Sequence, residues 1–179
     1  MIDLCKLNVS LRVASESELE MFKTDLQEAF KMSAESEFGG ELNEPIPSDS
    51  DIEESFAAVG SVIYHVLVGN NISGGAVVSI DEKTQHNTLL LFFIKVGGHD
   101  RGLGSKAWTE IEKMHPETEV WETVTPYFEK RNIHFYVNKC GFKIVEFYNR
   151  YHPDPNQRPK KSDEEDEMFK FQKIMKIKI

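Results

Sequence analysis

The amino-acid sequence predicts an α/β domain in which a mixed sheet is flanked by helices. Segments of alternating apolar and polar residues, typical of strands, are interspersed with segments whose apolar residues recur every three to four positions, as in helices. No internal repeat or Gly/Ser-rich linker interrupts the 179 residues, a length that suits one domain. We therefore expect residues 1–179 to form one domain with the element order β-α-α-β-β-β-α-β-α-β-β.

The chain is expected to open with a strand followed by a helix. Residues 7–13 alternate between aliphatic and polar side chains, which suits a strand. Ser15 and Ser17 are each followed by a glutamate three residues later, the capping-box pattern of a helix N-terminus. The helix that follows places large apolar residues on one face: Leu19, Phe22, Leu26 and Phe30.

A loop, a short helix and three strands are expected next. Glycines and prolines after Met32 favour a loop, and residues 51–58 suit a short helix. Two strands are joined through Gly69 and two asparagines, which favour a hairpin turn. A further segment is apolar on both faces, as in a central strand covered on both sides. These three expected strands cover residues 62–68, 75–80 and 89–96.

The second half of the chain is expected to alternate helices and strands. A helix over 105–114 is followed by a strand over 120–124. Pro126 suits the first position of a helix and Gly141 suits its end, so a further helix is expected between them. The chain is expected to finish with two strands and, between them, a charged, proline-rich mobile loop: 142–151, 168–179 and 152–167.

Composition limits the classes of function. The formal net charge of −9 argues against a nucleic-acid surface, which needs a basic stripe. Two cysteines, Cys5 and Cys140, provide neither a disulfide framework nor a paired-cysteine metal motif. The apolar run 89–94 is too short to span a bilayer, and the first residues lack the features of a secretory signal. We expect a cytoplasmic protein with no nucleic-acid, membrane or metal partner.

The most informative segment joins the expected strand 89–96 to the expected helix 105–114. Glycines there let successive backbone N–H groups converge on an anion, and a helix N-terminus adds free N–H donors and partial positive charge. Arg101 could add a phosphate contact. The segment predicts a site for a phosphorylated ligand, although a tight connection without a ligand would use the same residues. Its glycines are Gly97, Gly98, Gly102 and Gly104.

Two well-known phosphate-binding patterns can be compared with this segment. A Walker A loop is excluded because the Gly-Lys-Ser/Thr triplet is absent. Gly102, Gly104 and Ala107 satisfy the spacing of a dinucleotide-binding turn, and Glu122 lies where a ribose-binding acid would be expected. The long connection before Gly102 and the short remainder of the chain after Glu122 argue against a dinucleotide-binding fold.

The segment resembles the phosphate motif of the GNAT superfamily of N-acetyltransferases, a strand, Val-x-Pro-x-x-(Gln/Arg)-x-x-Gly-x-(Gly/Ala), and a helix. The defined positions are taken, in order, by Ile94, Val96, His99, Gly102 and Gly104. The element order of the whole chain agrees with this family. The resemblance implies a GNAT-like, mostly antiparallel central sheet of about six to seven strands flanked by about four helices.

A second motif of the family is an asparagine-bearing helix that leads to Leu-Tyr-x-(Lys/x)-x-Gly-Phe. Lys139, Gly141 and Phe142 match it. Tyr136 lies one residue before the family's tyrosine position, and Asn132 lies two residues after its asparagine position. One helical residue corresponds to about 100° of rotation, so an offset changes the direction in which the side chain points. The offsets therefore bear on the roles of these two side chains.

The resemblance also implies acetyl-CoA as co-substrate. Backbone amides of the loop would bind its pyrophosphate, and the backbone of an opened strand would pair with its pantetheine arm. The residues expected to bind acetyl-CoA are Phe92, Phe93, Ile94, His99, Asp100, Arg101, Gly102, Leu103, Gly104, Ser105 and Asn132.

The implied reaction is transfer of the acetyl group to a primary amine by direct attack in a ternary complex. A strand N–H would polarise the thioester carbonyl, a base would accept the amine proton, and a donor would assist the leaving thiolate. We expect Tyr136 to be the donor, with a core tyrosine as the alternative. We expect Glu122 to be the base, with a solvated glutamate as the alternative. His134 suits a second base or a surface position, and Cys140 suits a core position.

The acceptor is expected to be a small-molecule or peptidyl amine. Residues 32–82 contain no Lys or Arg, and carboxylates accumulate over 35–54, which in this family lies beside the acceptor site. A surface rich in carboxylates beside the acceptor site would attract a cationic amine, although a solvated acidic loop has the same composition. Two other functions stay open: a non-catalytic acyl-CoA-binding module, and a nicotinamide-dependent oxidoreductase built on Gly102 and Glu122. The apolar strand 169–179 could pair across a homodimer, and core burial explains it equally well.

Overall fold

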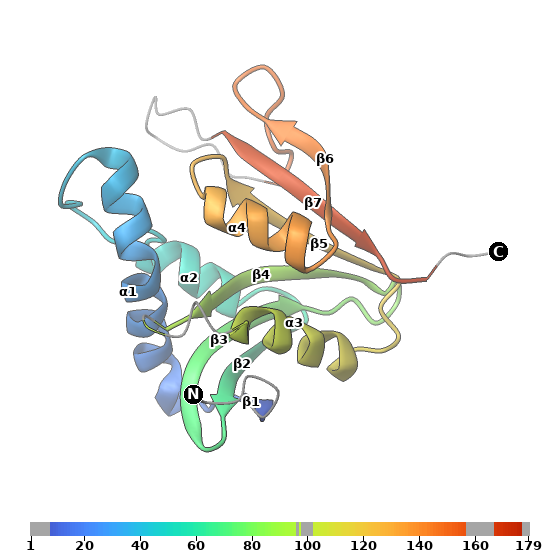
Figure 1. Ribbon diagram of the computed structural model, residues 1–179. Coiled ribbons are helices and arrows are strands. Elements are labelled where there is room, and N and C mark those ends of the chain that lie inside the picture. The colour runs from blue at the N-terminus through green and yellow to red at the C-terminus, as the bar shows by residue number, and fades with distance from the viewer. Residues whose placement is uncertain (1–7, 96, 98–101, 157–166, 177–179) are drawn as a thin grey trace.

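The computed structural model describes residues 8–95, 97, 102–156 and 167–176, and the chain within these ranges forms one seven-stranded sheet with helices on both faces (Figure 1). The strands are β1 Val9–Val13, β2 Ser61–Val68, β3 Asn71–Ser79, β4 His86–Ile94, β5 Val120–Pro126, β6 Lys143–Tyr148 and β7 Met168–Ile174. The helices are α1 Leu19–Phe38, α2 Asp49–Phe56, α3 Leu103–Met114 and α4 Lys130–His134. A 3-10 turn, Glu16–Glu18, precedes α1, and a π-helical turn, Phe135–Lys139, follows α4.

The sheet is mixed, as the element order predicts, and mostly antiparallel, as the family resemblance implies. Its strand order is β1-β2-β3-β4-β5-β7-β6, and β4 and β5 are its parallel neighbours. The other neighbouring strands pair antiparallel. The element order and the fold class are confirmed. A doubly wound dinucleotide-binding sheet, which needs successive parallel strands, is not what this chain forms.

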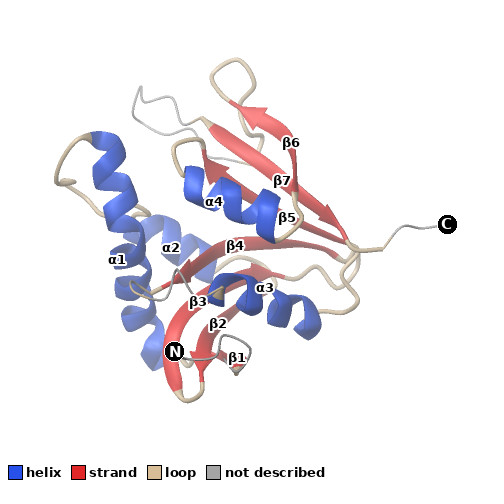
Figure 2. Cartoon of the chain, viewed as in Figure 1, coloured by secondary structure: helices blue, strands red, loops and turns tan. Residues whose placement is uncertain are grey.

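The helices form two layers, one on each face of the sheet (Figure 2). α1 and α2 cover one face through a core that includes Phe22, Leu26, Ile52, Val77 and Phe93. α3 and the segment from α4 to the π-helical turn cover the other face through a larger core, which contains both tryptophans. Among the described helices, none combines the length and the apolar composition of a membrane span.

The 3-10 turn that leads into α1 begins with the capping box predicted at Ser15. The backbone N–H of Ser15 donates to the Glu18 carboxylate at 2.9 Å, and Phe22 and Leu26 on the predicted apolar face are fully buried. The helix extends to Phe38 and ends at Gly39, whose φ of 78° is left-handed. α1 therefore occupies part of the segment that the sequence suggested was a loop.

The predicted helix start at Pro126 is wrong. Thr125 and Pro126 pair with Phe169 and Met168 of β7, so they extend β5. The Pro126 carbonyl then accepts the N–H of Glu129 at 3.0 Å, and α4 begins one residue later. Proline can end a strand because it needs to supply no ladder donor there. The local preference for a helix start was overridden by pairing with a strand distant in the sequence.

Other boundaries differ because strand pairing extends the apolar runs. β3 begins at Asn71 instead of residue 75, and β4 begins at His86, which pairs with Val120. The last two strands are shorter than predicted. Most of the expected loop 152–167, together with Cys5, lies outside the described residues.

Candidate active site

β4 and β5 begin as neighbours and then separate (Figure 1). Their ladder joins three residue pairs: His86 with Val120, Asn87 with Trp121, and Thr88 with Glu122. Beyond it, β4 continues to Ile94 beside β3, and β5 continues to Pro126 beside β7. The edge of β4 that faces β5 therefore has no ladder partner among the described strands. Backbone N–H and C=O groups on such an edge can bind an extended ligand.

A β-bulge and a side-chain hydrogen bond mark the point of separation. Leu89 and Leu91 pair with adjacent residues of β3, so Leu90 is an extra residue in β4. The Thr123 hydroxyl of β5 donates to the Leu89 carbonyl at 2.9 Å, where the next ladder bond would otherwise form. A bulge bends its strand, so β4 turns away from β5 directly after Leu89.

The N-terminus of α3 lies beside the end of β4. Gly102 precedes the helix with a φ of 65°, a left-handed conformation that favours glycine. A Cβ at Gly104 would lie 3.0 Å from the Phe135 ring and 3.8 Å from Ile94. Gly104 thus allows close packing between α3, β4 and the π-helical turn. The first backbone N–H groups of α3 have no partner within the helix and can bind an anion.

The other residues predicted to bind acetyl-CoA divide into two groups. Leu103 is buried in the core, Ser105 lies in the first turn of α3, and Asn132 lies in α4, half-buried. His99, Asp100 and Arg101 lie outside the described residues, so their phosphate contacts stay predictions.

Tyr136 is buried on the α3–α4 face, next to the point of separation. Its ring contacts Phe142 and Phe171, and its hydroxyl hydrogen bonds with the side chains of Thr123 and Thr125. Burial raises the pKa of the Tyr136 phenol well above its ordinary value, and the nearby thiol of Cys140 and carboxylate of Glu129 act in the same direction. The hydroxyl therefore stays protonated at neutral pH and can donate a proton or a hydrogen bond.

The π-helical turn accommodates the one-residue shift of Tyr136. The Cys140 N–H donates to the Phe135 carbonyl at 3.0 Å, the i to i+5 bond of a π-helix. Such a turn holds about one residue more than an α-helical turn. One extra residue between Tyr136 and Gly141 therefore need not rotate the tyrosine away from the sheet.

Glu122 lies on the opposite face of the sheet from Tyr136. Successive side chains of a strand alternate between faces, and Thr123 points toward Tyr136. The Glu122 carboxylate accepts a hydrogen bond from the Gln172 side chain and lies 3.3 Å from the Lys170 ammonium. The two predicted catalytic residues therefore approach the separation point from opposite faces.

Two residues near Tyr136 were not predicted from the sequence. Phe135 stacks on Phe92 of β4, with ring centroids 5.4 Å apart and an interplanar angle of 10°. Glu129 precedes α4, and its side chain is buried although it carries a carboxyl group. A glycine inside a helix often indicates close approach by another group, so Gly104 indicated that a side chain packs against the start of α3. That side chain is Phe135. No comparable signal indicated Glu129.

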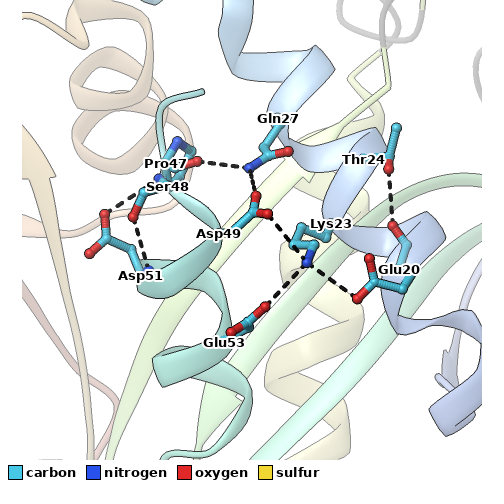
Figure 3. Close-up of polar contacts among 9 residues, drawn as sticks. All are labelled: Glu20, Lys23, Thr24, Gln27, Pro47, Ser48, Asp49, Asp51 and Glu53. Carbon is cyan, nitrogen blue, oxygen red and sulfur yellow. Dashed lines mark hydrogen bonds and ion pairs between the residues drawn. The ribbon is translucent and has the colours of Figure 1, made fainter. Parts of the chain in front are cut away.

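The acidic segment 35–54 is partly neutralised by contacts between α1 and α2 (Figure 3). Lys23 of α1 lies 3.2 Å from Glu53 and 3.6 Å from Asp49 of α2. The Asp51 N–H donates to the Ser48 hydroxyl at 3.1 Å at the start of α2. Asp49 and Glu53 therefore link α2 to α1, whereas Ser48 and Asp51 cap α2 itself. Exposed carboxylates in the loop between the two helices include Glu41 and Glu44.

The remaining candidates have ordinary surroundings. His134 is exposed, and its Nδ1 lies 2.8 Å from the Asn138 amide. Cys140 is buried, and burial raises the pKa of its thiol to about 12, so the thiolate needed of a nucleophile is disfavoured. Within the described ranges, no three His, Cys, Asp or Glu side chains are grouped so that they could hold a metal ion.

Solved structures that share this architecture include acetyltransferases of the GNAT family. The ribosomal-protein-S18-alanine N-acetyltransferase of Escherichia coli matches with a TM-score of 0.67 and 10% identity, over 95% of this chain and 96% of its own. A GNAT family acetyltransferase from Elizabethkingia anophelis with acetyl-CoA bound has a TM-score of 0.67 and 14% identity, over 95% and 100%. A Bacillus subtilis acetyltransferase in complex with CoA has a TM-score of 0.66 and 14% identity, over 94% and 99%. The fold is the GNAT acetyltransferase fold.

Comparison at the level of sequence gives a closer relative. The uncharacterized protein YrkN of Bacillus subtilis (strain 168) is 51% identical over 176 residues, which cover 95% of this chain and 95% of YrkN. The chain therefore belongs to the same family as YrkN. No protein-family model matches the chain.

Proposed function

We propose that this protein transfers an acetyl group from acetyl-CoA to the primary amine of a small-molecule or peptidyl acceptor. The observation that carries the proposal is the separation of β4 from β5 after Thr88 and Glu122, beside the N-terminus of α3. Solved proteins of this fold that hold CoA or acetyl-CoA support it. A cytoplasmic location and a homodimer stay predictions.

The local geometry suits the two ends of such a co-substrate. The free edge of β4 between Leu90 and Ile94 offers backbone N–H and C=O groups to an extended arm that contains amides. The free N–H groups at the start of α3 suit a pyrophosphate. Acetyl-CoA would supply the reactive thioester.

In this proposal the sheet separates the two substrates. Tyr136 serves the co-substrate from the α3–α4 face, where Thr123 and Thr125 orient its hydroxyl toward the leaving sulfur. Glu122 serves the acceptor from the α1–α2 face and takes up the amine proton, directly or through water. A backbone N–H of β4 polarises the carbonyl. Direct attack then takes place through the opening between β4 and β5.

We further propose that the acceptor is cationic. Asp49 and Glu53 are engaged by Lys23, so they contribute less to attraction than the composition alone suggested. Glu41 and Glu44 in the α1–α2 loop are exposed, and the net charge of −9 favours approach of a cation. A polyamine, an aminoglycoside and a lysine-containing peptide are suitable first acceptors.

Thermal unfolding with acetyl-CoA, CoA or NADH tests ligand binding before any acceptor is known. A ligand at about 100 times its dissociation constant adds about 2.7 kcal/mol to the stability, which is readily measured. We expect stabilisation by acetyl-CoA and CoA, and thiol release when the correct amine is added. Stabilisation by NADH alone would refute the proposal. Binding of acetyl-CoA without thiol release for any amine class would favour the non-catalytic module.

A further inference from the structure

Phe135 connects the two parts of the sheet, β1 to β4 and β5 to β7, at the proposed co-substrate site. Its ring stacks on Phe92, which belongs to the stretch of β4 that no longer pairs with β5. Phe135 itself belongs to the π-helical turn that follows β5 and α4. The contact therefore connects β4 to the segment that follows β5, at the level where the two strands have separated.

The same ring also contacts the start of α3. The ideal Cβ position at Gly104 lies 3.0 Å from Cε2 and 3.3 Å from Cζ of Phe135. In the proposed function, pyrophosphate binds at the start of α3 and the pantetheine arm extends from there along β4. Phe135 contacts both Gly104 and Phe92, so its ring lies next to both parts of this path.

We propose that Phe135 controls access of the pantetheine arm, and that its ring must rotate away from Phe92 before the arm can lie along β4. The inference rests on the proposed function. Phe135 would then determine selectivity. A ligand that contains the pantetheine arm must displace the ring, whereas the nucleotide portion of CoA can bind without displacing it.

The surroundings of Phe135 allow this movement. The residue is half-buried, so it is not enclosed on all sides by the core against which it packs. The π-helical turn is wider than an α-helical turn, and such turns often occur at functional sites. The Phe135 ring also contacts the neighbouring Tyr136 ring, with centroids 5.5 Å apart. Tyr136 has further contacts with Phe142 and Phe171 in the core, and these do not depend on the position of Phe135.

Binding of CoA and of adenosine 3′,5′-bisphosphate, which lacks the arm, separates the two contributions. Calorimetric titration would compare the wild-type protein with Phe135→Ala, Phe135→Leu and the control Phe147→Ala. Phe147 is an aromatic residue of edge strand β6, in contact with Tyr127 and Phe169. Removing the stacked ring should tighten CoA binding about three- to tenfold in Phe135→Ala, with a smaller gain in Phe135→Leu. Bisphosphate binding should stay unchanged in all variants.

Each alternative outcome has a distinct meaning. Weaker CoA binding by Phe135→Ala with unchanged bisphosphate binding would make Phe135 a wall that holds the arm, and would overturn the inference. Unchanged CoA binding by both Phe135 variants would also overturn it. If the wild-type protein binds neither ligand, the proposed function itself fails. If Phe135→Ala does not fold, the direction of change in Phe135→Leu decides.

Discussion

The parallel β4–β5 pair has a closed end, where a ladder joins the strands, and an open end, where they have separated. At the closed end, Trp121 is fully buried against Trp108 and His115, and the Asn87 amide donates to the Thr118 hydroxyl at 2.7 Å. Each polar group in that hydrogen bond is buried and satisfied.

At the open end, the β4 edge has no ladder partner among the described strands, and Phe135 stacks on Phe92 of β4. Phe135 there is half-buried, and Tyr136 meets two threonine hydroxyls. A continuous ladder would stabilise the pair more but would leave no free edge for a ligand. The difference suggests that the closed end supplies the stability that allows the open end to stay unpaired.

The largest expected effect comes from removing the indole at the closed end. Trp121→Ala should lower the free energy of unfolding by about 3–5 kcal/mol, because it leaves a cavity beneath Trp108. Urea denaturation measures this change. Ile174→Ala is the matched control, since Ile174 pairs with Val120 at the same end but is 65% exposed. A loss in Trp121→Ala no greater than in the control would show that the closed end does not anchor the sheet.

The next effect concerns catalysis at the open end. Tyr136→Phe should reduce the rate of thiol release about a hundredfold, which corresponds to about 2.7 kcal/mol, if its hydroxyl assists the leaving sulfur. The free energy of unfolding should fall by only about 1 kcal/mol, from the lost threonine hydrogen bonds. Because burial raises the pKa of Tyr136, the wild-type rate should not fall with rising pH below about pH 10. If Tyr136→Phe releases thiol at the same rate as the wild type, Tyr136 is a core residue without a catalytic role.

The contrast between the two ends also explains what the sequence could predict. The element order and the buried face of α1 follow from alternation, helical spacing and the Ser15–Glu18 cap, all local signals. The apolar part of β4 and the strand 120–124 were predicted, whereas the polar residues that join the pair at its closed end, His86, Asn87 and Thr88, were not. Local patterns of this kind survive because the tertiary structure agrees with them.

The open end could not be derived in the same way. Pro126 suggested a helix locally, but pairing with β7 extends β5 through it. The stacking of Phe135 on Phe92 joins residues distant in sequence, and no spacing rule brings them together. The resemblance to a family indicated an opened strand at Phe92, whereas the π-helical turn that places Tyr136 became visible only in the structure.

A third, smaller effect should come from the strand that supports the open end from its other side. A Cβ at Gly75 of β3 would lie 2.3 Å from the Phe22 ring and 2.6 Å from the Phe93 ring. Gly75→Ala should therefore destabilise the fold by about 1–3 kcal/mol, measured by urea denaturation. Gly40→Ala, with nothing within 4 Å of the added carbon, should change stability by less than about 0.5 kcal/mol. Equal effects of the two substitutions would mean that α1 and β4 adjust to the added methyl group.

The smallest expected effect is a pH dependence of stability that arises from His65, a residue in register with Gly75 and Phe93. His65 of β2 pairs with Gly75, which pairs with Phe93, so it lies two strands from the open end. Its ring is 1% exposed, and neither nitrogen has a hydrogen-bond partner in the described structure. Burial, the dominant cause, lowers the pKa of His65, and the Glu18 carboxylate 3.5 Å from its Nε2 opposes this only in part.

The sign of the pH effect follows from which state binds the proton. With a depressed pKa in the folded protein, His65 stays neutral there, while the unfolded chain takes up a proton as the pH falls below about 6.5. Stability contributed at neutral pH is therefore lost on acidification, by at most about 1.4 kcal/mol per pH unit for one proton. His65→Gln should lose less stability than the wild type between about pH 7.5 and pH 5.5. His134→Gln, at an exposed site, should follow the wild type, and parallel curves for all three proteins would show that Glu18 compensates fully for the burial of His65.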